Sequence, residues 1–447
     1  MQKATSSTTP GTSRRDFIKH SSLLVAGGAV AASTLSVARA AHSFGSDTIK
    51  IGLVGCGGRG TEAAVQAMNT SGGEVKLVAL ADVYADRVQA AYRGAKSRHE
   101  AKVDVPKERQ FVGFNAYQDL LKTDIDLVIL ATPPGFRPLH FEAAVAAGKH
   151  VFMEKPVAVD PAGVRKVLAA TAESKKKNLA VGVGLQRRHE RWYKETIKAV
   201  QDGAIGDIVL ARAYWNGSTP WLKLRQDGQT EMDYQMRNWY YFNWLCGDHI
   251  VEQHIHNLDV INWVKNGPPK TAQGQGGCEV RRGKEYGETF DHHFIEFTYG
   301  DGTVMLSQCR HQPNCWNAVS EHLHGTKGTC DVSGSKIYDP TGKVIQNFSH
   351  RNGEDGGHQQ EHHDLFADLR AGRLPNEGEY GALSSMTAIF GRMATYSGQM
   401  LNWDECLNSQ VVVSPVEKYT SFDDKPPVAP LPEGGYALPV PGKTKVV

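Results

Sequence analysis

Three glycines near residue 55 have a spacing that can bind phosphate. Gly55, Gly57 and Gly60 follow the pattern G-x-G-x-x-G. The first glycine of this pattern permits a tight turn, the second lets the backbone approach a pyrophosphate, and the third lets a helix pack on the preceding strand. Gly58 and Arg59 would lie at the N-terminus of that helix, which attracts phosphate. The spacing predicts a dinucleotide site; the alternative is an ordinary strand-to-helix turn.

An acidic residue at the end of the next strand indicates which dinucleotide binds. Asp82 lies 22 residues after Gly60 and follows the apolar run 75–81. A carboxylate at this position can accept hydrogen bonds from a ribose 2'-hydroxyl and repels a 2'-phosphate. The sequence therefore predicts NAD as the cofactor, in preference to NADP.

A lysine that could transfer a proton follows a later strand. Lys155 belongs to the tripeptide Glu154-Lys155-Pro156, directly after the apolar run 151–153. A lysine at the carboxyl end of a parallel strand opens into the ligand crevice, where it can act as a general acid or base. The alternative is a surface lysine in a turn.

A second group of candidate catalytic residues lies in the helix-like segment 247–263. Glu252, His256 and Asp259 share one face of such a helix by their i, i+4, i+7 spacing. His249 and His254 together with Glu252 and His256 could also suggest zinc. No H-E-x-x-H or C-x-x-C spacing accompanies them. We therefore predict general acid-base chemistry by Glu252 and His256, and no metal site.

These residues need a scaffold of alternating strands and helices, and the chain supplies one. Strand-like runs at 49–54, 75–81, 127–131, 151–153 and 180–184 alternate with helix-like segments. We predict an α/β Rossmann domain with a doubly wound parallel sheet over 47–185. Strand-like runs at 208–214, 293–299, 303–309 and 321–324 are separated by glycine turns. We therefore predict an α+β domain with a largely antiparallel open sheet over 186–406. A chain of 447 residues exceeds one hydrophobic core, which also favours two domains.

Taken together, these motifs resemble a known family. The glycine loop, Asp82, Thr132-Pro133-Pro134 and Glu154-Lys155-Pro156 are similar to those of the glucose-fructose oxidoreductase, inositol dehydrogenase and rhizopine-catabolism (Gfo/Idh/MocA) family, and the match covers the whole first domain. In that family the lysine lies near nicotinamide and substrate. The resemblance implies that Thr132, Pro133, His140 and Glu154 also border the cofactor.

The resemblance extends to the second set of candidate residues. Segment 247–263 is similar to the family's D-x-x-x-H-x-x-D, whose acid and histidine contact the substrate hydroxyl. Glu252 stands at the aspartate position, and its extra methylene is long enough to shift the carboxylate by more than a hydrogen-bond tolerance, so its role follows less directly from the resemblance than those of Lys155 and His256. The resemblance implies an oxidoreductase for a secondary hydroxyl of a sugar, polyol or glycoside.

Other candidate substrate contacts have structural alternatives. Arg187 and Arg188 lie at the predicted domain junction, where they could hold sugar hydroxyls or form interdomain ion pairs. Trp239 and Tyr241 belong to a run of aromatic residues that suits sugar faces, but it could equally form core or a dimer contact. We include Asp259 among the substrate contacts, and we expect a homo-oligomer that pairs through the second-domain sheet.

The N-terminus carries a compartment signal rather than catalytic residues. Arg14-Arg15, the apolar stretch 23–37 and Ala38-Arg39-Ala40 are typical of a twin-arginine export signal over 1–40 and predict a periplasmic or otherwise exported protein. Without these residues, which carry five Lys or Arg and one Asp, the 50 basic and 48 acidic residues become 45 and 47. This balance, with no basic block, argues against nucleic acid or membrane as a partner.

The remaining features concern cysteines and the C-terminus. The seven cysteines contain no C-x-x-C, and Cys309 and Cys315 are the first candidates for a late disulfide. Residues 407–447 form a proline-rich tail that we expect to be extended on the surface or disordered.

Export limits the reactions that fit. The periplasm holds no NAD pool, so we expect a tightly bound, internally recycled nucleotide. Three alternatives follow: a sugar or polyol oxidoreductase, a redox-neutral glycoside hydrolase or epimerase that oxidises the ring transiently, and a nucleotide-loaded sensor without turnover.

Overall fold

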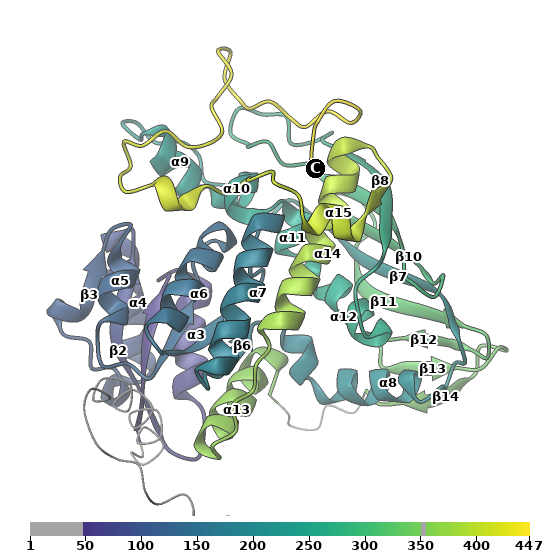
Figure 1. Cartoon of the computed structure of the whole chain (residues 1–447), viewed down its shortest axis with the longest axis horizontal. Coiled ribbons are helices and arrows are strands. Elements are labelled where there is room, and N and C mark those ends of the chain that lie inside the picture. Colours follow the sequence, from purple (N-terminus) through teal and green to yellow (C-terminus); the bar gives the residue numbers. More distant parts are fainter. Residues whose placement is uncertain (1–47, 350–354) are drawn as a thin grey trace, which may run out of the picture. The chain divides into compact units, whose positions relative to one another are not determined.

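The glycine turn belongs to a parallel sheet of six strands, which confirms the predicted Rossmann fold (Figure 1). The computed structural model describes residues 48–349 and 355–447, so the predicted export signal lies outside the described residues. The sheet order is β3-β2-β1-β4-β5-β6, and every neighbouring pair is parallel. Its strands are β1 (Thr48–Val54), β2 (Glu74–Asp82), β3 (Gln110–Val112), β4 (Leu127–Leu130), β5 (His150–Met153) and β6 (Val181–Val183). The carboxyl ends of β1, β2, β4 and β5 therefore meet at one edge, where ligands bind in this architecture.

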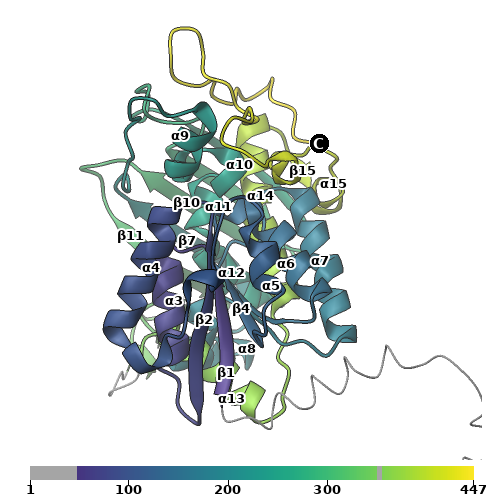
Figure 2. The ribbon, with the colours of Figure 1, turned by 90° about the vertical axis from the view of Figure 1, so that its left-hand side faces the viewer.

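Helices cover both faces of this sheet. Figure 2 shows α3 (Gly58–Met68) and α4 (Ala85–Arg98) on one side, and α5 (Ala116–Leu121), α6 (Arg137–Ala146) and α7 (Pro161–Lys176) on the other. In β4, Leu127 and Ile129 pack in the core under α3 and α4, whereas Val128 and Leu130 pack in the core under the other helices. Strands buried on both faces need such continuous apolar runs.

The second sheet has nine strands in the order β14-β13-β12-β11-β7-β10-β9-β8-β15. It is mixed: β7 and β10 are parallel and the other neighbouring pairs are antiparallel. The largely antiparallel second sheet is thus also confirmed. Its strands are β7 (Ile208–Gly217), β8 (Thr271–Gly277), β9 (His292–Thr298), β10 (Val304–His311), β11 (Ala318–Gly325), β12 (Thr329–Asp331), β13 (Lys336–Tyr338), β14 (Val344–Asn347) and β15 (Leu401–Asn402).

One long helix lies between the two sheets. The helices of this half are α8 (Arg191–Gln201), α9 (Glu231–Arg237), α10 (Asn243–Cys246), α11 (His249–Glu252), α12 (Ile255–Lys265), α13 (Gly357–Arg370), α14 (Gly378–Ser397) and α15 (Trp403–Leu407). In α14, 17 of 20 residues are buried, because the helix packs on α7 and β6 as well as on β8 and β9 (Figure 1). The sequence of α14 by itself suggests an amphipathic helix with one exposed face. Because α14 is in contact with other elements on both sides, little of its surface is exposed to solvent.

The segment predicted as one helix over 247–263 is broken. Helix α11 ends at Glu252, α12 begins at Ile255, and Gln253 and His254 separate them. Glu252 and His256 therefore lie on two helices, and the single-helix face inferred from their spacing is wrong. At the break Gln253 has a φ of −115°, and the His254 amide bonds to the carbonyl of His249, five residues earlier, so the regular helical hydrogen bonds are interrupted.

The proline-rich tail is irregular but packed. Beyond α15 it contains one short 3-10 helix, η7 (Val416–Lys418), and its Val416 and Tyr436 side chains are buried. Its chain runs beside α9 and α10 (Figure 1). Within the described residues, no helix is both long and apolar enough to span a bilayer.

Candidate active site

The glycine loop leaves open space in front of helix α3. Gly55 has φ +96°, and a side chain there would overlap the backbone of Thr132. A side chain at Gly60 would overlap the carbonyl of Gly55, so the loop and α3 touch. At Gly57 and Gly58, by contrast, an added Cβ would have no atom within 4 Å. No side chain caps the first turn of α3, so its amides face this space, as a pyrophosphate requires.

Asp82 borders the same space and also shapes it. Its two carboxylate oxygens accept hydrogen bonds from the amides of Cys56 (2.7 Å) and Tyr84 (2.9 Å). Burial raises the pKa of Asp82, and these two bonds oppose that rise. The carboxylate therefore holds the glycine turn as well as presenting a negative charge to a ribose.

Because Asp82 both holds the glycine turn and carries a negative charge, the effects of replacing it on cofactor choice have to be separated. In Asp82→Ser the affinity for NAD should fall, and the ratio of the NADP to the NAD dissociation constant should move toward NADP, because the charge that repels a 2'-phosphate is gone. Loss of the two amide bonds should weaken both nucleotides equally, so the ratio is the quantity to measure by titration. Asp119→Ser, which removes an exposed acid paired with Lys122, is the control. An unchanged ratio in Asp82→Ser would refute the assignment.

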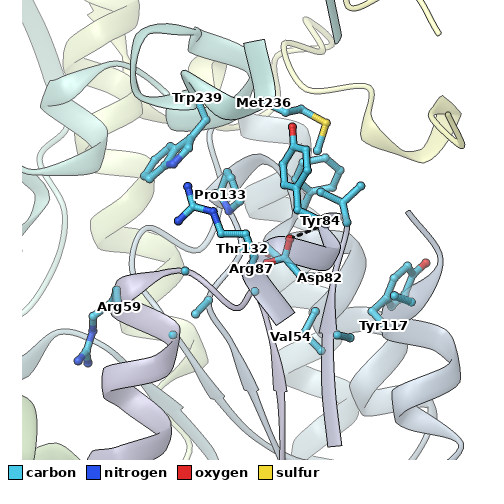
Figure 3. A pocket seen from close by; sticks show the side chains of 18 of the residues that line it. Val54, Arg59, Asp82, Tyr84, Arg87, Tyr117, Thr132, Pro133, Met236 and Trp239 are labelled. Carbon is cyan, nitrogen blue, oxygen red and sulfur yellow. Dashed lines mark hydrogen bonds between the residues drawn. The ribbon is translucent and has the colours of Figure 1, made fainter. Parts of the chain in front are cut away.

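The glycine loop and Asp82 open into one large cavity of about 480 Å³ (Figure 3). Nine of the predicted cofactor residues line it: Gly55, Gly57, Gly58, Arg59, Gly60, Asp82, Thr132, Pro133 and His140. Its opposite wall comes from the second half of the chain and comprises Trp221, Lys223, Met236, Arg237 and Trp239. The cavity is therefore built by both halves, which is how dinucleotide sites are usually enclosed.

A buried arginine, which the sequence analysis did not single out, connects the ends of β4 and β5 next to this cavity. Arg137, at the start of α6, donates to the carbonyls of Thr132 (2.6 Å) and Glu154 (3.0 Å). Burial lowers the pKa of Arg137 to about 10. His140, one turn further on, lies 3.2 Å from the Thr132 hydroxyl, and burial lowers its pKa to about 3, so the ring is neutral. The ends of β4 and β5 are thus held together at the ligand edge.

Arg59 turns toward carboxylates. Its Nε lies 2.5 Å from Glu154 and its Nη2 lies 3.0 Å from Glu361 on α13. Burial, followed by the charge of Glu154, raises the pKa of Glu361 well above its usual range. Nothing local in the sequence marks Glu361, which lies 302 residues from its partner. A direct contact of Arg59 and Glu154 with the cofactor stays a prediction.

Lys155 and Glu252 form an ion pair at the end of β5. The Lys155 Nζ donates to Glu252 Oε1 (3.0 Å) and to the Glu252 backbone carbonyl (2.6 Å). Only 15% of the lysine side chain and 10% of the glutamate side chain are exposed. Burial raises the pKa of Glu252, against the effect of Lys155, and its Oε2 has no hydrogen-bond partner among the described residues. The extra methylene of Glu252 therefore does not prevent contact with the lysine.

His256 lies in the first turn of α12 as a neutral ring. It stacks on Trp215 with ring centroids 5.9 Å apart, and its Nδ1 has no partner among the described residues. Burial, reinforced by the charge of Lys155, holds the pKa of His256 well below its usual range. A neutral imidazole with a free nitrogen can accept a hydrogen bond from a substrate hydroxyl.

The predicted arginine contacts are engaged in ion pairs. Arg188 binds both oxygens of Asp259 at 2.8 to 3.1 Å, and Ser384 donates to the same carboxylate. Arg187 bonds the fully buried carboxylate of Glu321, which Asn257 also holds. The sequence analysis gave such ion pairs as the alternative to contacts with sugar hydroxyls. A substrate role for Arg187, Arg188 and Asp259 stays a prediction and would require these pairs to open.

The aromatic run divides between core and cavity. Tyr241 is fully buried, and its hydroxyl donates to the carbonyls of Pro220 and Trp221. Trp244 is also fully buried. Trp239 instead points into the cavity (Figure 3). Of the two aromatic substrate contacts predicted, only Trp239 therefore lies where a ligand can reach it.

The histidines near Glu252 are held by hydrogen bonds. His249 Nδ1 lies 2.8 Å from Asp248, and His254 Nε2 lies 2.8 Å from Ser307. Among the described residues, the grouping that could hold a metal is Asp248, His249 and His293, not the set suggested by the sequence. Its carboxylate also accepts bonds from Tyr396 (2.6 Å) and the Phe290 amide (2.9 Å), which a cation would have to displace. All seven cysteines fall within the described residues and are free, so Cys309 and Cys315 are not joined.

The fold and the site define a two-domain protein with an NAD-binding Rossmann domain. Residues 49–183 match the model of an oxidoreductase family with an NAD-binding Rossmann fold. Residues 193–331 match the model of the GFO/IDH/MocA C-terminal domain. The chain belongs to the Gfo/Idh/MocA family.

Individual relatives share about a quarter to a third of their aligned residues with this chain. Inositol 2-dehydrogenase of Salmonella typhimurium is 31% identical over 232 residues, 51% of this chain and 57% of that protein. An uncharacterized oxidoreductase of Streptococcus pneumoniae is 26% identical over 316 residues, 65% of this chain and 73% of that protein. The alignment thus spans little more than half the length of the inositol dehydrogenase.

Solved structures show the same fold. Scyllo-inositol dehydrogenase of Lactobacillus casei, with NAD(H) and scyllo-inositol bound, superposes with a TM-score of 0.59 at 21% identity, covering 80% of this chain and 99% of that one. A levoglucosan dehydrogenase in complex with NADH and levoglucosan gives 0.60 at 15% identity, covering 79% and 99%.

Proposed function

We propose that the protein oxidises a secondary hydroxyl of a polyol or sugar with NAD. The observation that carries this proposal is the buried Lys155–Glu252 pair at the end of β5. This end of β5 lies at the same edge of the sheet as the glycine loop, which is called the glycine cradle below. The relatives that act on inositols and the neighbour that binds levoglucosan support a ring-shaped polyol or sugar as substrate.

We assign the following roles in cofactor binding and proton transfer. Gly57, Gly58 and Asp82 would hold the dinucleotide, which accepts hydride from the substrate carbon when bound. Glu252, with its pKa raised by burial and one oxygen free, would take the hydroxyl proton. Lys155 would keep that carboxyl ionised and donate to the substrate oxygen, and neutral His256 would orient the hydroxyl.

We also propose that the nucleotide is retained. Helix α9, which contributes residues to the cavity wall, is held in place by several contacts. Arg237 lies 3.7 Å over the Tyr84 ring and pairs with Asp86 at 2.9 Å, while Phe422 of the tail stacks on Tyr84 at 5.1 Å. Tail carbonyls accept bonds from Thr230 (2.6 Å) and Gln235 (2.7 Å). These contacts would have to break before a nucleotide could leave on the ribose side, so release should be slow.

One experiment tests both proposals. Protein purified without added nucleotide should release NAD or NADH on denaturation, detected by mass spectrometry. Inositols, hexoses and glycosides should then change the 340 nm absorbance of the bound nucleotide roughly stoichiometrically. A nucleotide-free protein that works only with added NAD would refute retention alone. Absence of any change with the whole panel, with nucleotide bound, would refute the oxidoreductase proposal. Product without net reduction would instead identify a redox-neutral hydrolase or epimerase.

Two further proposals concern assembly and location. The open face of the second sheet carries Phe294 of β9, 40% exposed, together with the partly exposed Leu306 of β10 and Tyr214 of β7. We propose that this face pairs two copies; light scattering should then give a dimer or tetramer mass, and a monomer would refute the pairing. The Arg14-Arg15 motif supports export, which cell fractionation of an Arg14→Lys, Arg15→Lys variant should abolish.

A further inference from the structure

An exposed tryptophan lies in the cavity wall opposite the glycine cradle. Trp221 lines the cavity and is 42% exposed. Its ring lies 5.9 Å from Trp239 and 5.5 Å from the buried ring of Tyr240, so the two tryptophans form one aromatic surface with Tyr240 behind it. Exposing an indole to water is unfavourable, and an exposed aromatic cluster inside a cavity indicates a binding surface.

This aromatic surface leads to the catalytic carboxylate. Tyr240 stacks on His311 at 6.3 Å, and His311 Nε2 lies 2.6 Å from Gln253, the neighbour of Glu252. Burial, and next the charge of Glu252, hold the pKa of the Tyr240 hydroxyl well above its usual range. Trp221 and Trp239 are thus connected, through Tyr240 and His311, to the residue that follows Glu252.

We propose that Trp221 and Trp239 form a subsite for a second ring of the substrate, joined to the ring that is oxidised. This inference rests on the proposed function above. A ring whose hydroxyl meets Lys155 and Glu252 occupies the crevice at the end of β5, and Tyr240 separates that position from Trp221. A pyranose or aryl ring linked to the reacting sugar would reach the tryptophans and cover their apolar faces. The substrate class is therefore a glycoside or disaccharide rather than a free inositol or hexose.

The surroundings suit a sugar better than a purely apolar ring. Lys223 lies in the same wall two residues from Trp221, and Arg87 of α4 also lines the cavity (Figure 3). Cationic donors around an aromatic surface can bond hydroxyls at the edge of a stacked pyranose. The nucleotide has its own contacts on the opposite wall, at the glycine loop and Asp82.

The test compares single-ring and two-ring ligands on Trp221→Ala and on a matched control. Trp316→Ala removes an equally apolar residue that is 65% exposed and packs on Tyr214 of the open sheet. For the nucleotide-loaded protein, KM for hexoses should differ from KM for their p-nitrophenyl glycosides and for cellobiose, with the two-ring ligands favoured. Trp221→Ala should raise KM for the two-ring ligands about tenfold, as loss of one aromatic contact implies. The single-ring KM should rise much less than the two-ring KM, and Trp316→Ala should resemble the wild type with both kinds of ligand.

Three results would overturn the subsite. They are an equal effect of Trp221→Ala on one-ring and two-ring ligands, a loss of bound nucleotide in that variant, and no preference of the wild type for two rings. Failure of the oxidation itself is distinguished by calorimetric titration. If the protein binds cellobiose or a nitrophenyl glycoside without turning it over, and Trp221→Ala weakens that binding, the subsite stands and the proposed function fails. If it binds neither, the subsite fails.

Discussion

Replacing Lys155 by methionine is expected to leave the nucleotide in place and to lower turnover by roughly a hundred- to ten-thousand-fold, the usual contribution of one general acid-base group. Methionine matches the length of the lysine stem but cannot donate to Glu252, whose carboxyl is already buried with its pKa raised. Without the ammonium, whose charge opposes the effect of burial, the ionised form of Glu252 that accepts a proton would be disfavoured. The measurement is single-turnover reduction of the bound nucleotide, with nucleotide content determined on the same sample.

The control for this variant is Lys149→Met. Its Nζ donates to the carbonyls of Thr123 and Ile125, away from the cavity lining, so turnover should persist. Turnover near the wild-type rate in Lys155→Met would make Lys155 structural. Loss of bound nucleotide in that variant would place the lysine on the cofactor instead.

Replacing Gly57 by valine is expected to abolish nucleotide binding while the protein stays folded. The Gly57 backbone is extended, with φ −74° and ψ −177°, which a β-branched residue adopts readily, and an added Cβ meets no atom within 4 Å. The branched side chain would fill the space where phosphates approach the helix amides. Overpacking at about 1–3 kcal/mol, together with lost charge-assisted hydrogen bonds, should weaken binding by about a hundredfold or more.

Two matched glycines make this result interpretable. Gly267→Val adds the same side chain at another open position, at the end of α12, and should bind nucleotide normally. Gly60→Ala should lower the melting temperature, because its Cβ would overlap the Gly55 carbonyl. If Gly57→Val bound NAD as the wild type does, the cradle would lie elsewhere.

Some features of this protein follow from the sequence by itself. The glycine spacing, Asp82 and the apolar runs of the parallel strands are local patterns, and each reports a backbone requirement within a few residues of itself. A tight turn accepts only glycine at Gly55, and a strand buried on both faces needs a continuous apolar run such as 127–130. Five of the six strands of the first sheet could therefore be predicted without coordinates, as could the cavity residues of the glycine loop and Asp82. Thr132, Pro133 and His140 followed from the family resemblance.

Other features were decided by the tertiary structure. Lys155 meets Glu252 across 97 residues, Arg188 meets Asp259 across 71, and Arg59 meets Glu361 across 302. A charged residue looks the same in sequence whether it binds a substrate or another buried charge, so the arginines could not be assigned. The residues at the break between α11 and α12 likewise have distant partners: His254 bonds Ser307, and Gln253 bonds His311. Partners brought together by folding leave no local pattern, because desolvation and pairing depend on what packs against a side chain and not on its neighbours in the chain.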